Sequence, residues 1–363
     1  MKYAVYIVRF VLGILFIISG LIKLNDPVGF AFKLEEYFSP PVLNLPFLEP
    51  LAFALAVFVC VVEVLLGVML IMGIYRKITL WSFLAMLVFF GFLTFYSAYY
   101  NKVTDCGCFG DAIKFTPWQS FGKDIFLLVL TLFLLANQKY IEPISKGVLP
   151  VAVSAASLVG CLLLVHYVYN HLPVKDFRPY KIGVNIPQGM VIPEGAPMPK
   201  FDYHWKFMID GKEQVIVTQG DYPKVEGEFI AVETKEVDKG YVPPIHDFFI
   251  EKDDESYFDQ MMSKEKLLMV ISYNLEKSDE EAFTAVKKAT DKALKKGYTV
   301  IGLTSILQQA ETIKNKYELN FDFYFNDETT LKTMIRSNPG IMILSKGTII
   351  DKKHFNDLDK LNI

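Results

Sequence analysis

Residues 51–100 read LAFALAVFVCVVEVLLGVMLIMGIYRKITLWSFLAMLVFFGFLTFYSAYY, two long apolar runs separated by the basic pair Arg76-Lys77. A helix needs roughly 20 apolar residues to cross a bilayer, and Leu51–Ile74 and Ile78–Tyr100 each reach that length. Three further stretches also reach it: Tyr3–Leu21, Trp118–Ala136 and Val148–Tyr169. The sequence therefore predicts five transmembrane helices. The first is expected to be retained, because it lacks the small-residue cleavage site of a signal peptide.

The charges in the loops orient these helices. Arg76 and Lys77 follow the second helix, and Lys139 and Lys146 lie between the fourth and fifth. Because positive loops mark the cytoplasmic side, the alternate loops and everything after residue 169 are expected on the periplasmic side of a bacterial inner membrane. Disulfides persist there. The formal net charge of −3, with mixed signs, gives no electrostatic case for nucleic acid.

One outward loop, residues 105–110, reads DCGCFG and holds two of the four cysteines, Cys106 and Cys108. A disulfide needs Cα atoms within about 7 Å, and a strained ring makes it a better oxidant. The loop therefore predicts thiol–disulfide chemistry at the membrane surface, with these two residues as the catalytic candidates. Cys60 and Cys161 fall near mid-helix and are interpreted as small packing residues.

Five charged residues in or beside the apolar runs are candidates for a polar site inside the membrane, where ionisable groups are costly and often functional. One interpretation pairs Arg9 with Glu63 to fix helix packing and leaves Lys123 and Asp124 near the interface. The other places these four residues, with Lys23, in a polar pocket under the cysteine loop that binds a quinone headgroup or relays protons. The sequence leaves both interpretations open.

The first 145 residues resemble the DoxX/MauE family of bacterial membrane proteins. The motif Cys106-Gly107-Cys108-Phe109-Gly110 is similar to that of MauE, the methylamine-utilisation member, and is the most specific part of the match. The other matching residues are Arg9, Gly13, Phe16, Ser19-Gly20, Lys23 and Asp26-Pro27. The resemblance implies a four-helix membrane domain over residues 1–145 and a part in forming disulfides in periplasmic proteins beside a thioredoxin-like partner. Other members of the same family are tied to quinone reduction, so the resemblance also implies quinone as a candidate cofactor. A fifth helix, residues 146–170, is an addition to this pattern.

Residues 171–244 are predicted to form a proline- and glycine-rich connector with a β-hairpin. Apolar and polar residues alternate over Phe201–Lys235, on both sides of Asp210-Gly211, which is a strong turn signal. The segments Phe207–Ile209 and Val215–Val217 would be the paired strands, with residues 227–232 as a further strand.

Residues 245–363 alternate strands with helices, which predicts a soluble α/β domain with helices on both faces of a sheet. Strands are expected over Lys266–Tyr273, Thr299–Leu303, Phe321–Phe325, 341–344 and 348–350, and helices over Ser278–Lys296, Ile306–Tyr317 and Glu328–Arg336. Ser278 would be a helix N-cap with Glu281 completing a capping box.

This order resembles the thioredoxin fold, with Asn338-Pro339 at the position of its cis-proline. Asn274-Leu275-Glu276-Lys277 stands where the Cys-x-x-Cys pair is expected. Such a domain cannot exchange dithiols itself, so its expected use is peptide binding beside Pro339 by strand addition.

Three functions are compatible with these residues. The first is a thiol oxidoreductase that takes electrons from extracytoplasmic protein thiols through Cys106 and Cys108 and passes them to a membrane quinone. The second is a non-enzymatic assembly or chaperone factor, in which the cysteine pair only stiffens its loop. A metal site using the pair and His171 is the weakest, because the sequence offers no second cysteine or histidine cluster to complete it.

Overall fold

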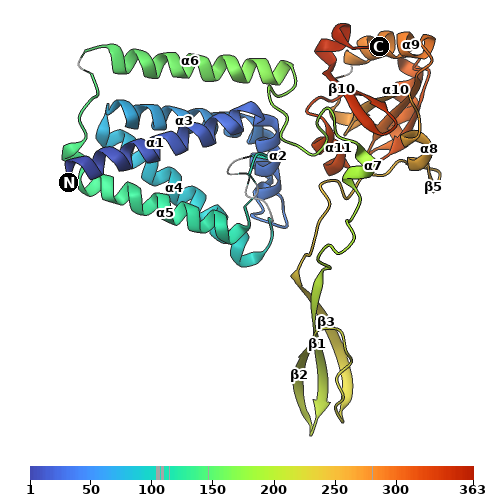
Figure 1. The fold of residues 1–363 in the computed structure, drawn as a ribbon, viewed down its shortest axis with the longest axis horizontal. Helices are drawn as coiled ribbons and strands as arrows, with labels where there is room; N and C mark the ends of the chain where they lie inside the picture. Colours follow the sequence, from blue (N-terminus) through green and yellow to red (C-terminus); the bar gives the residue numbers. More distant parts are fainter. Residues whose placement is uncertain (104–106, 108–109, 114, 146, 280) are drawn as a thin grey trace.

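The computed structural model describes residues 1–103, 107, 110–113, 115–145, 147–279 and 281–363. Within these ranges five helices are long and apolar enough to cross a membrane, and they form one bundle (Figure 1). They are α1 (Lys2–Asn25), α3 (Ala52–Met72), α4 (Arg76–Tyr100), α5 (Pro117–Ala136) and α6 (Leu149–Asn170). The five predicted transmembrane helices are therefore confirmed, and the chain is a membrane protein with a helical bundle at its N-terminal end.

A short helix that the sequence analysis missed, α2 (Pro27–Phe38), crosses one end of this bundle (Figure 1). It starts where it does because the Asp26 side chain accepts a hydrogen bond from Gly29 N at 2.9 Å and Pro27 occupies the first helical position. Its apolar face packs against α3 and α6. We call the end of the bundle that carries α2 the loop end, because Gly107 and Gly110 also lie there.

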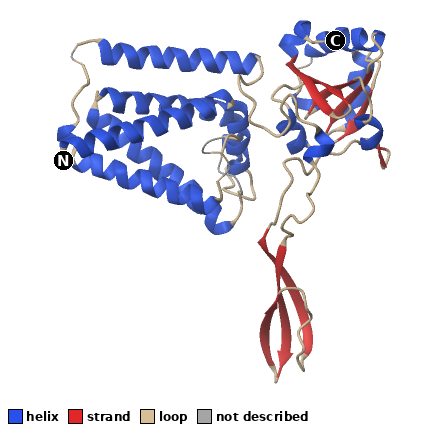
Figure 2. Cartoon of the chain, in the orientation of Figure 1, coloured by secondary structure: helices blue, strands red, loops and turns tan. Residues whose placement is uncertain are grey.

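The C-terminal part is a mixed α/β domain (Figure 2). Its described strands form a seven-stranded sheet in the order β10-β9-β6-β7-β8-β4-β5. The parallel strands β6 (Leu267–Ser272), β7 (Thr299–Thr304) and β8 (Asp322–Phe325) adjoin the antiparallel β9 (Gly340–Ser345) and β10 (Thr348–His354). Two short strands, β4 (Glu251–Lys252) and β5 (Glu255–Ser256), extend the other edge. The predicted succession of strands and helices along the chain is confirmed, and Asn338–Pro339 is a cis peptide just before β9.

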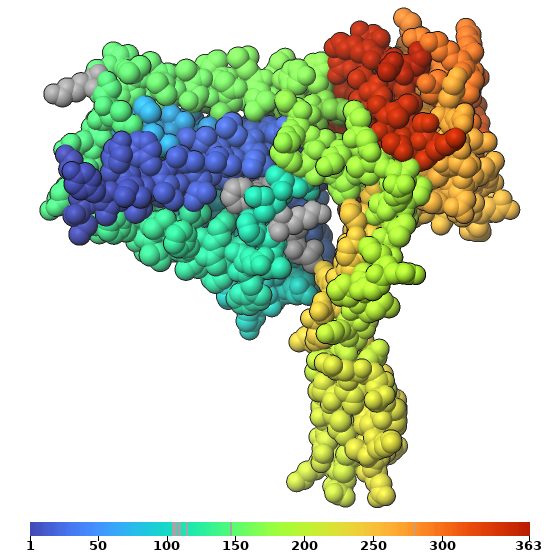
Figure 3. Space-filling view, in the orientation of Figure 1, coloured from blue at the N-terminus to red at the C-terminus, as the bar shows by residue number. Residues whose placement is uncertain are grey.

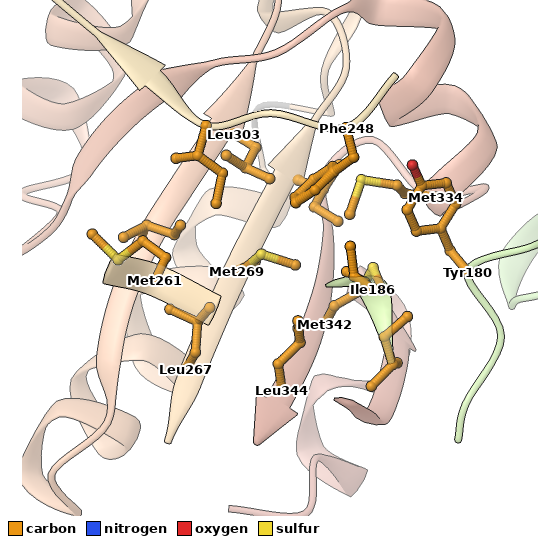
Figure 4. Close-up of a cluster of buried hydrophobic side chains, with 14 of the residues drawn as sticks. Tyr180, Ile186, Phe248, Met261, Leu267, Met269, Leu303, Met334, Met342 and Leu344 are labelled. Carbon is orange, nitrogen blue, oxygen red and sulfur yellow. The ribbon is translucent and has the colours of Figure 1, made fainter. Parts of the chain in front are cut away.

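Helices cover both faces of this sheet. Leu267, Met269 and Ile271 of β6 face a cluster that includes α8 (Phe258–Met262) and α11 (Glu328–Met334), part of which Figure 4 shows. The alternate residues Leu268 and Val270 face α9 (Ala282–Lys295), α10 (Ala310–Lys316) and the turn η5 (Phe355–Lys360). All six residues of β6 are buried, as expected for a central strand covered on both sides.

Two of the predicted helices in this domain begin later than expected. Ser278 is not the cap of α9: its hydroxyl bonds Ser272 and Asn338, and the helix begins at Ala282, whose N–H donates to the Asp279 carboxylate at 3.2 Å. The helix predicted from residue 306 opens with the 3-10 turn η4 (Leu307–Gln309) and continues as α10. In the first case the Ser278 hydroxyl finds its partners across the sheet rather than in its own helix.

Residues 200–238 form a separate three-stranded sheet that stands clear of the rest of the molecule, which we call the β-arm (Figures 1 and 3). Its order is β2-β1-β3, with β1 (Lys200–Ile209), β2 (Lys212–Thr218) and β3 (Glu228–Asp238). The predicted hairpin is confirmed, because Asp210 and Gly211 both take positive φ at the turn. The connector before it is not wholly extended, since α7 (Ile186–Gly189) interrupts it.

The α/β domain is expected to lose stability as the pH falls from about 6.5 toward 4. Burial lowers the pKa of His354 to about 4, and its neutral Nδ1 accepts the Asn356 N–H at 3.2 Å at the start of η5. The unfolded state binds more protons in this window, so stability present above pH 6.5 falls by roughly 1–3 kcal/mol. Denaturant unfolding at several pH values tests this, and a His354→Asn variant should flatten the pH dependence. A dependence that persists in the variant would contradict the assignment to His354.

Candidate functional site

A cleft of about 1020 Å³ lies at the loop end of the bundle, where three parts of the chain meet. One wall is α2 with Phe30, Phe32 and Lys33, and a second is formed by Lys332 of α11 in the α/β domain and by Arg336, which follows that helix. The third wall is the stem that carries the β-arm, represented by Lys239, Val242 and His246. Burial raises the pKa of Glu35, which also lines the cleft. The cleft therefore combines apolar walls with charges of both signs.

The cysteine loop borders this cleft. Cys106 and Cys108 themselves lie outside the described residues, but Gly107 and Gly110 line the cleft. Gly107 is buried against α2, with φ near 64°, and a side chain there would meet Lys33 and Phe30. Its carbonyl accepts a hydrogen bond from Gly110 N at 3.0 Å. Gly107 thus packs on α2, Gly110 lies near Ile22 of α1, and both glycines line the cleft.

A buried ion pair lies beside this loop. Lys23 Nζ contacts the Glu63 carboxylate, and the two side chains are only 3% and 6% exposed. The Lys23 ammonium also lies 5.4 Å from the Phe30 ring centroid and 5.1 Å from that of Phe90. Lys23 lines the cleft as well, so the pair connects the space near the cysteine loop with the interior of the bundle.

The predicted pairing of Arg9 with Glu63 is wrong. Arg9 Nε donates to the Leu70 carbonyl at 2.8 Å and Nη1 donates to the Glu142 carbonyl at 2.8 Å. Its Nη2 also donates to the Ile71 carbonyl. Arg9 therefore satisfies the Leu70 and Ile71 carbonyls in the last turn of α3, where a helix leaves carbonyls without intrahelical partners. Lys23 is the partner of Glu63 because of how α1 packs on α3. Gly20 packs directly on Val64 and Cys60 of α3, and Lys23, about one turn further along α1, is thereby brought to Glu63.

Lys123 and Asp124 form an ion pair at 2.9 Å, but only Lys123 lies partly exposed. Asp124 is buried and accepts a hydrogen bond from Thr94 Oγ1 at 3.0 Å. It lines a separate groove of about 300 Å³ between α4 and α5, formed otherwise by apolar residues and Gly91. The structure thus brings Lys23 and Glu63 together beside the cysteine loop, and it places Arg9 and the Lys123–Asp124 pair elsewhere.

The free cysteines among the described residues, Cys60 and Cys161, are both buried in the cluster that α2, α3 and α6 share. His171, the other residue considered for a metal, pairs with Asp357 of η5 at 2.7 Å. In the described ranges no group of three or more histidine, cysteine or acidic side chains is arranged to hold a metal ion.

The cis-proline side of the α/β domain is occupied by its own chain. Pro339 is buried, and the Asn338 carbonyl accepts a hydrogen bond from Asp279 N at 3.0 Å. The Asn338 side chain accepts from Ser272 Oγ at 2.9 Å and donates to the Asn274 carbonyl at 2.8 Å. A peptide added as a strand at Asn338 would have to displace the Asp279 hydrogen bond. Peptide binding beside Pro339 stays a prediction.

The α/β domain docks on the loop end through residues to which the sequence analysis assigned no such contact. Arg336 Nε lies 3.0 Å and 2.9 Å from the two Asp26 carboxylate oxygens, and its Nη2 lies 3.5 Å from Asp111, three positions after Cys108. The Phe32 ring packs edge-on to Tyr273 at 5.9 Å, and Lys332 Nζ lies 4.5 Å from its centroid. Asp26-Pro27, a cap followed by proline, was the signal from which α2 could have been found.

A buried charge cluster fixes the segment that joins α6 to the α/β domain. The Asp176 carboxylate accepts from Arg178 Nε at 2.8 Å and from Lys352 Nζ at 2.6 Å. Lys352 Nζ also donates to the Tyr180 carbonyl at 2.8 Å. Burial alone would raise the pKa of Asp176, but Arg178 and Lys352 lower it, so this carboxyl stays ionised. The connector is therefore held firmly beside the cleft.

Residues 1–137 match the family described as Methylamine utilisation protein MauE. The part of the membrane region that ends with α5 is therefore similar to MauE. Protein TlpB of Flavobacterium psychrophilum is a similar curated protein, 31% identical over 150 residues. That alignment covers 38% of this chain and 38% of TlpB, so it spans well under two thirds of the relative. No solved structure matches the chain. The comparisons thus support the MauE resemblance, and the MauE-like region includes the cysteine loop.

Removing the docking contacts is expected to release the α/β domain from the MauE-like region. Arg336→Ala removes the guanidinium that contacts both carboxylate oxygens of the half-buried Asp26. Phe32→Ala removes the ring that lies between Tyr273 and Lys332. In the double variant, amide hydrogen exchange in α2 and α11 should rise roughly 10-fold or more. Lys346→Ala is the control, because its ion pair with Glu265 is exposed. Unchanged exchange in the double variant would show that other contacts hold the domain.

Proposed function

We propose that this protein is a thiol–disulfide oxidoreductase of the membrane, in which Cys106 and Cys108 take electrons from extracytoplasmic protein thiols. The observation that carries the proposal is the position of Gly107 and Gly110, which belong to the cysteine loop and line a cleft of about 1020 Å³. Cys60 and Cys161 are buried in the bundle, which leaves Cys106 and Cys108 as the pair available to a protein thiol. The loop and the α/β domain would face the periplasm.

The reaction begins with the Cys106–Cys108 pair as a disulfide. A client thiolate attacks one sulfur, the S–S bond breaks, and the other cysteine leaves as a thiolate. A second client thiolate then attacks the mixed disulfide, which forms the client disulfide and releases the reduced pair. Two electrons have then passed from the client to Cys106 and Cys108.

A membrane quinone is the proposed acceptor that restores the disulfide. It takes two electrons and two protons and becomes a quinol, so the cycle balances. Lys23 and Glu63 are the residues proposed to serve this step, because Lys23 lines the cleft and its partner lies within the bundle. In this step the ion pair would hold the transferred protons close to the cysteine loop, inside the membrane bundle where a lipid-dissolved quinone can approach.

The test measures thiol consumption by the purified full-length protein in detergent micelles. Dithiothreitol serves as the reduced thiol and a short-chain ubiquinone as the acceptor, and quinol formation is followed by absorbance. We expect quinol and oxidised dithiothreitol to form in equal amounts over many turnovers. A rate of quinol formation equal to that without protein would exclude the oxidoreductase. It would favour the alternative, an assembly or chaperone factor with a structural cysteine loop.

A further inference from the structure

The β-arm is fixed to the wall of the cleft by its stem. Tyr241 N donates to the Pro197 carbonyl at 2.8 Å, which holds the two stem segments together. The returning segment then passes along the cleft at Lys239 and Val242 and is anchored at Ile245, which is buried and whose N–H donates to the Gly189 carbonyl at 3.2 Å. His246 follows and also lines the cleft. The arm therefore starts from the cleft itself and extends away from it (Figure 1).

One edge of the β-arm is suited to adding a strand. β2 pairs with β1 along an unbroken antiparallel register from Thr218 to Lys212, and its other edge has no partner strand in the described structure. The opposite edge strand, β3, is less suitable, because a register shift between Lys206 and Phe207 leaves Ile230 as a bulge. Bulges disturb the ladder and are one way in which proteins protect an edge.

Beyond its first two residues, Lys212 and Glu213, the β2 edge also lacks the other common protections. The residues of its second half, Val215, Ile216 and Val217, are apolar, none is proline, and the two valines are 52% and 51% exposed. Natural proteins usually blunt such an edge with charges, prolines or a covering element. An exposed apolar edge of this kind is a surface for β-strand addition.

The charge of the β-arm specifies the partner. Between residues 200 and 238 nine aspartate and glutamate residues face only five lysines. This excess of negative charge disfavours an anionic lipid surface and favours a basic segment, because complementary charges speed association and select partners. The alternation of a strand places apolar residues on one face and charges on the other.

We infer that the β2 edge binds an extended polypeptide segment in which apolar residues alternate with lysine or arginine. The segment adds to the β-arm as a fourth strand and continues along the stem toward the cleft. That this polypeptide is the thiol-bearing client rests on the proposed function. The binding itself does not, so the two can fail separately.

The probe is a fluorescent peptide of four Lys-Val repeats, titrated with the full-length protein and followed by fluorescence anisotropy. We expect Val215→Lys/Val217→Lys to raise the Kd by about 10-fold or more. The matched variant Ile230→Lys/Val237→Lys adds the same charge to equally exposed positions of β3 and should change the Kd less than about 2-fold. Equal weakening in both variants would show that only net charge matters and would overturn the inference.

Two changes in the peptide test the strand geometry without altering the protein. A peptide of four Glu-Val repeats should bind at least about 10-fold more weakly, because its charge matches that of the arm. A Lys-Val peptide with alternate backbone nitrogens methylated keeps its charge but loses the amide donors along one edge, and it should also bind about 10-fold more weakly. Full binding of the methylated peptide, or no binding of the unmodified one, would contradict strand addition.

Discussion

Replacing Lys23 with methionine is expected to destabilise the helix bundle by about 3–5 kcal/mol. The change leaves the Glu63 carboxylate buried among α1, α3 and their neighbours without its cation, since both side chains are almost wholly excluded from solvent. Coulomb attraction and the rings of Phe30 and Phe90 offset the cost of burying the ammonium, and nothing else among the described contacts offers Glu63 a positive partner. The measurement is the free energy of unfolding of the full-length protein in micelles.

Two matched variants show whether the loss comes from an uncompensated charge. Lys23→Met combined with Glu63→Leu removes both charges, and it should recover most of the loss, because an apolar pair of similar volume is often as stable as a buried ion pair. Lys33→Met removes an ammonium from the Lys33–Glu36 pair, which is about a third exposed, and should cost at most about 1 kcal/mol. An equal loss in Lys23→Met and in the double variant, with Lys33→Met unaffected, would mean that Lys23 contributes only by packing.

The partner of Glu63 shows where sequence reasoning reached its limit. Hydropathy located the five spanning helices, because burying apolar length in a bilayer depends on local sequence alone. Which charges meet inside the bundle depends on how the helices rotate against each other, and the glycines that bring α1 onto α3 set that rotation. Gly13, Gly20 and Gly67 are contact points at which a side chain would clash with the facing helix. The pattern of small residues was visible, but its consequence for Lys23 was not.

The α/β domain was predicted more completely than its role in the site. Alternating apolar strands and helices indicated the element order, since central strands covered on both faces, such as β6 and β9, are apolar along nearly their whole length. The docking surface depends on Phe32, Tyr273 and Arg336, which are far apart in sequence and meet only in the folded chain. No local pattern distinguishes such residues from ordinary surface ones. The helix α2 was overlooked because it is too short to show a spanning signal.

Replacing either loop cysteine with serine is expected to reduce quinone-linked thiol oxidation by at least about 100-fold. Serine keeps the size and polarity of the side chain, but it can neither form the disulfide nor resolve a mixed one. Cys60→Ser/Cys161→Ser is the matched control, and it should retain the rate, because both residues are buried in the bundle. A loss in the control equal to that of the loop variants would place the redox chemistry inside the membrane instead.

The two single variants should also differ from each other. Only one retains the sulfur that the client thiolate attacks. In that variant the remaining cysteine thiolate should attack a disulfide probe such as glutathione disulfide, form a mixed disulfide and release one glutathione thiolate. The other should remain largely unmodified, because access decides which sulfur reacts. Mass spectrometry of the intact protein identifies the modified cysteine. Equal modification of both would show that neither sulfur is preferred, and the order of attack and resolution would then not be fixed by the loop.

The reduction potential of the Cys106–Cys108 pair tests the central claim most directly. The full-length protein is equilibrated in buffers of known redox potential, its free thiols are trapped with a mass label, and the fraction of reduced pair is read from the intact mass. A redox-active pair should titrate with a potential above about −300 mV and become oxidised again when a quinone is added. A potential below that range, with no response to quinone, would identify a structural disulfide and contradict the proposed function.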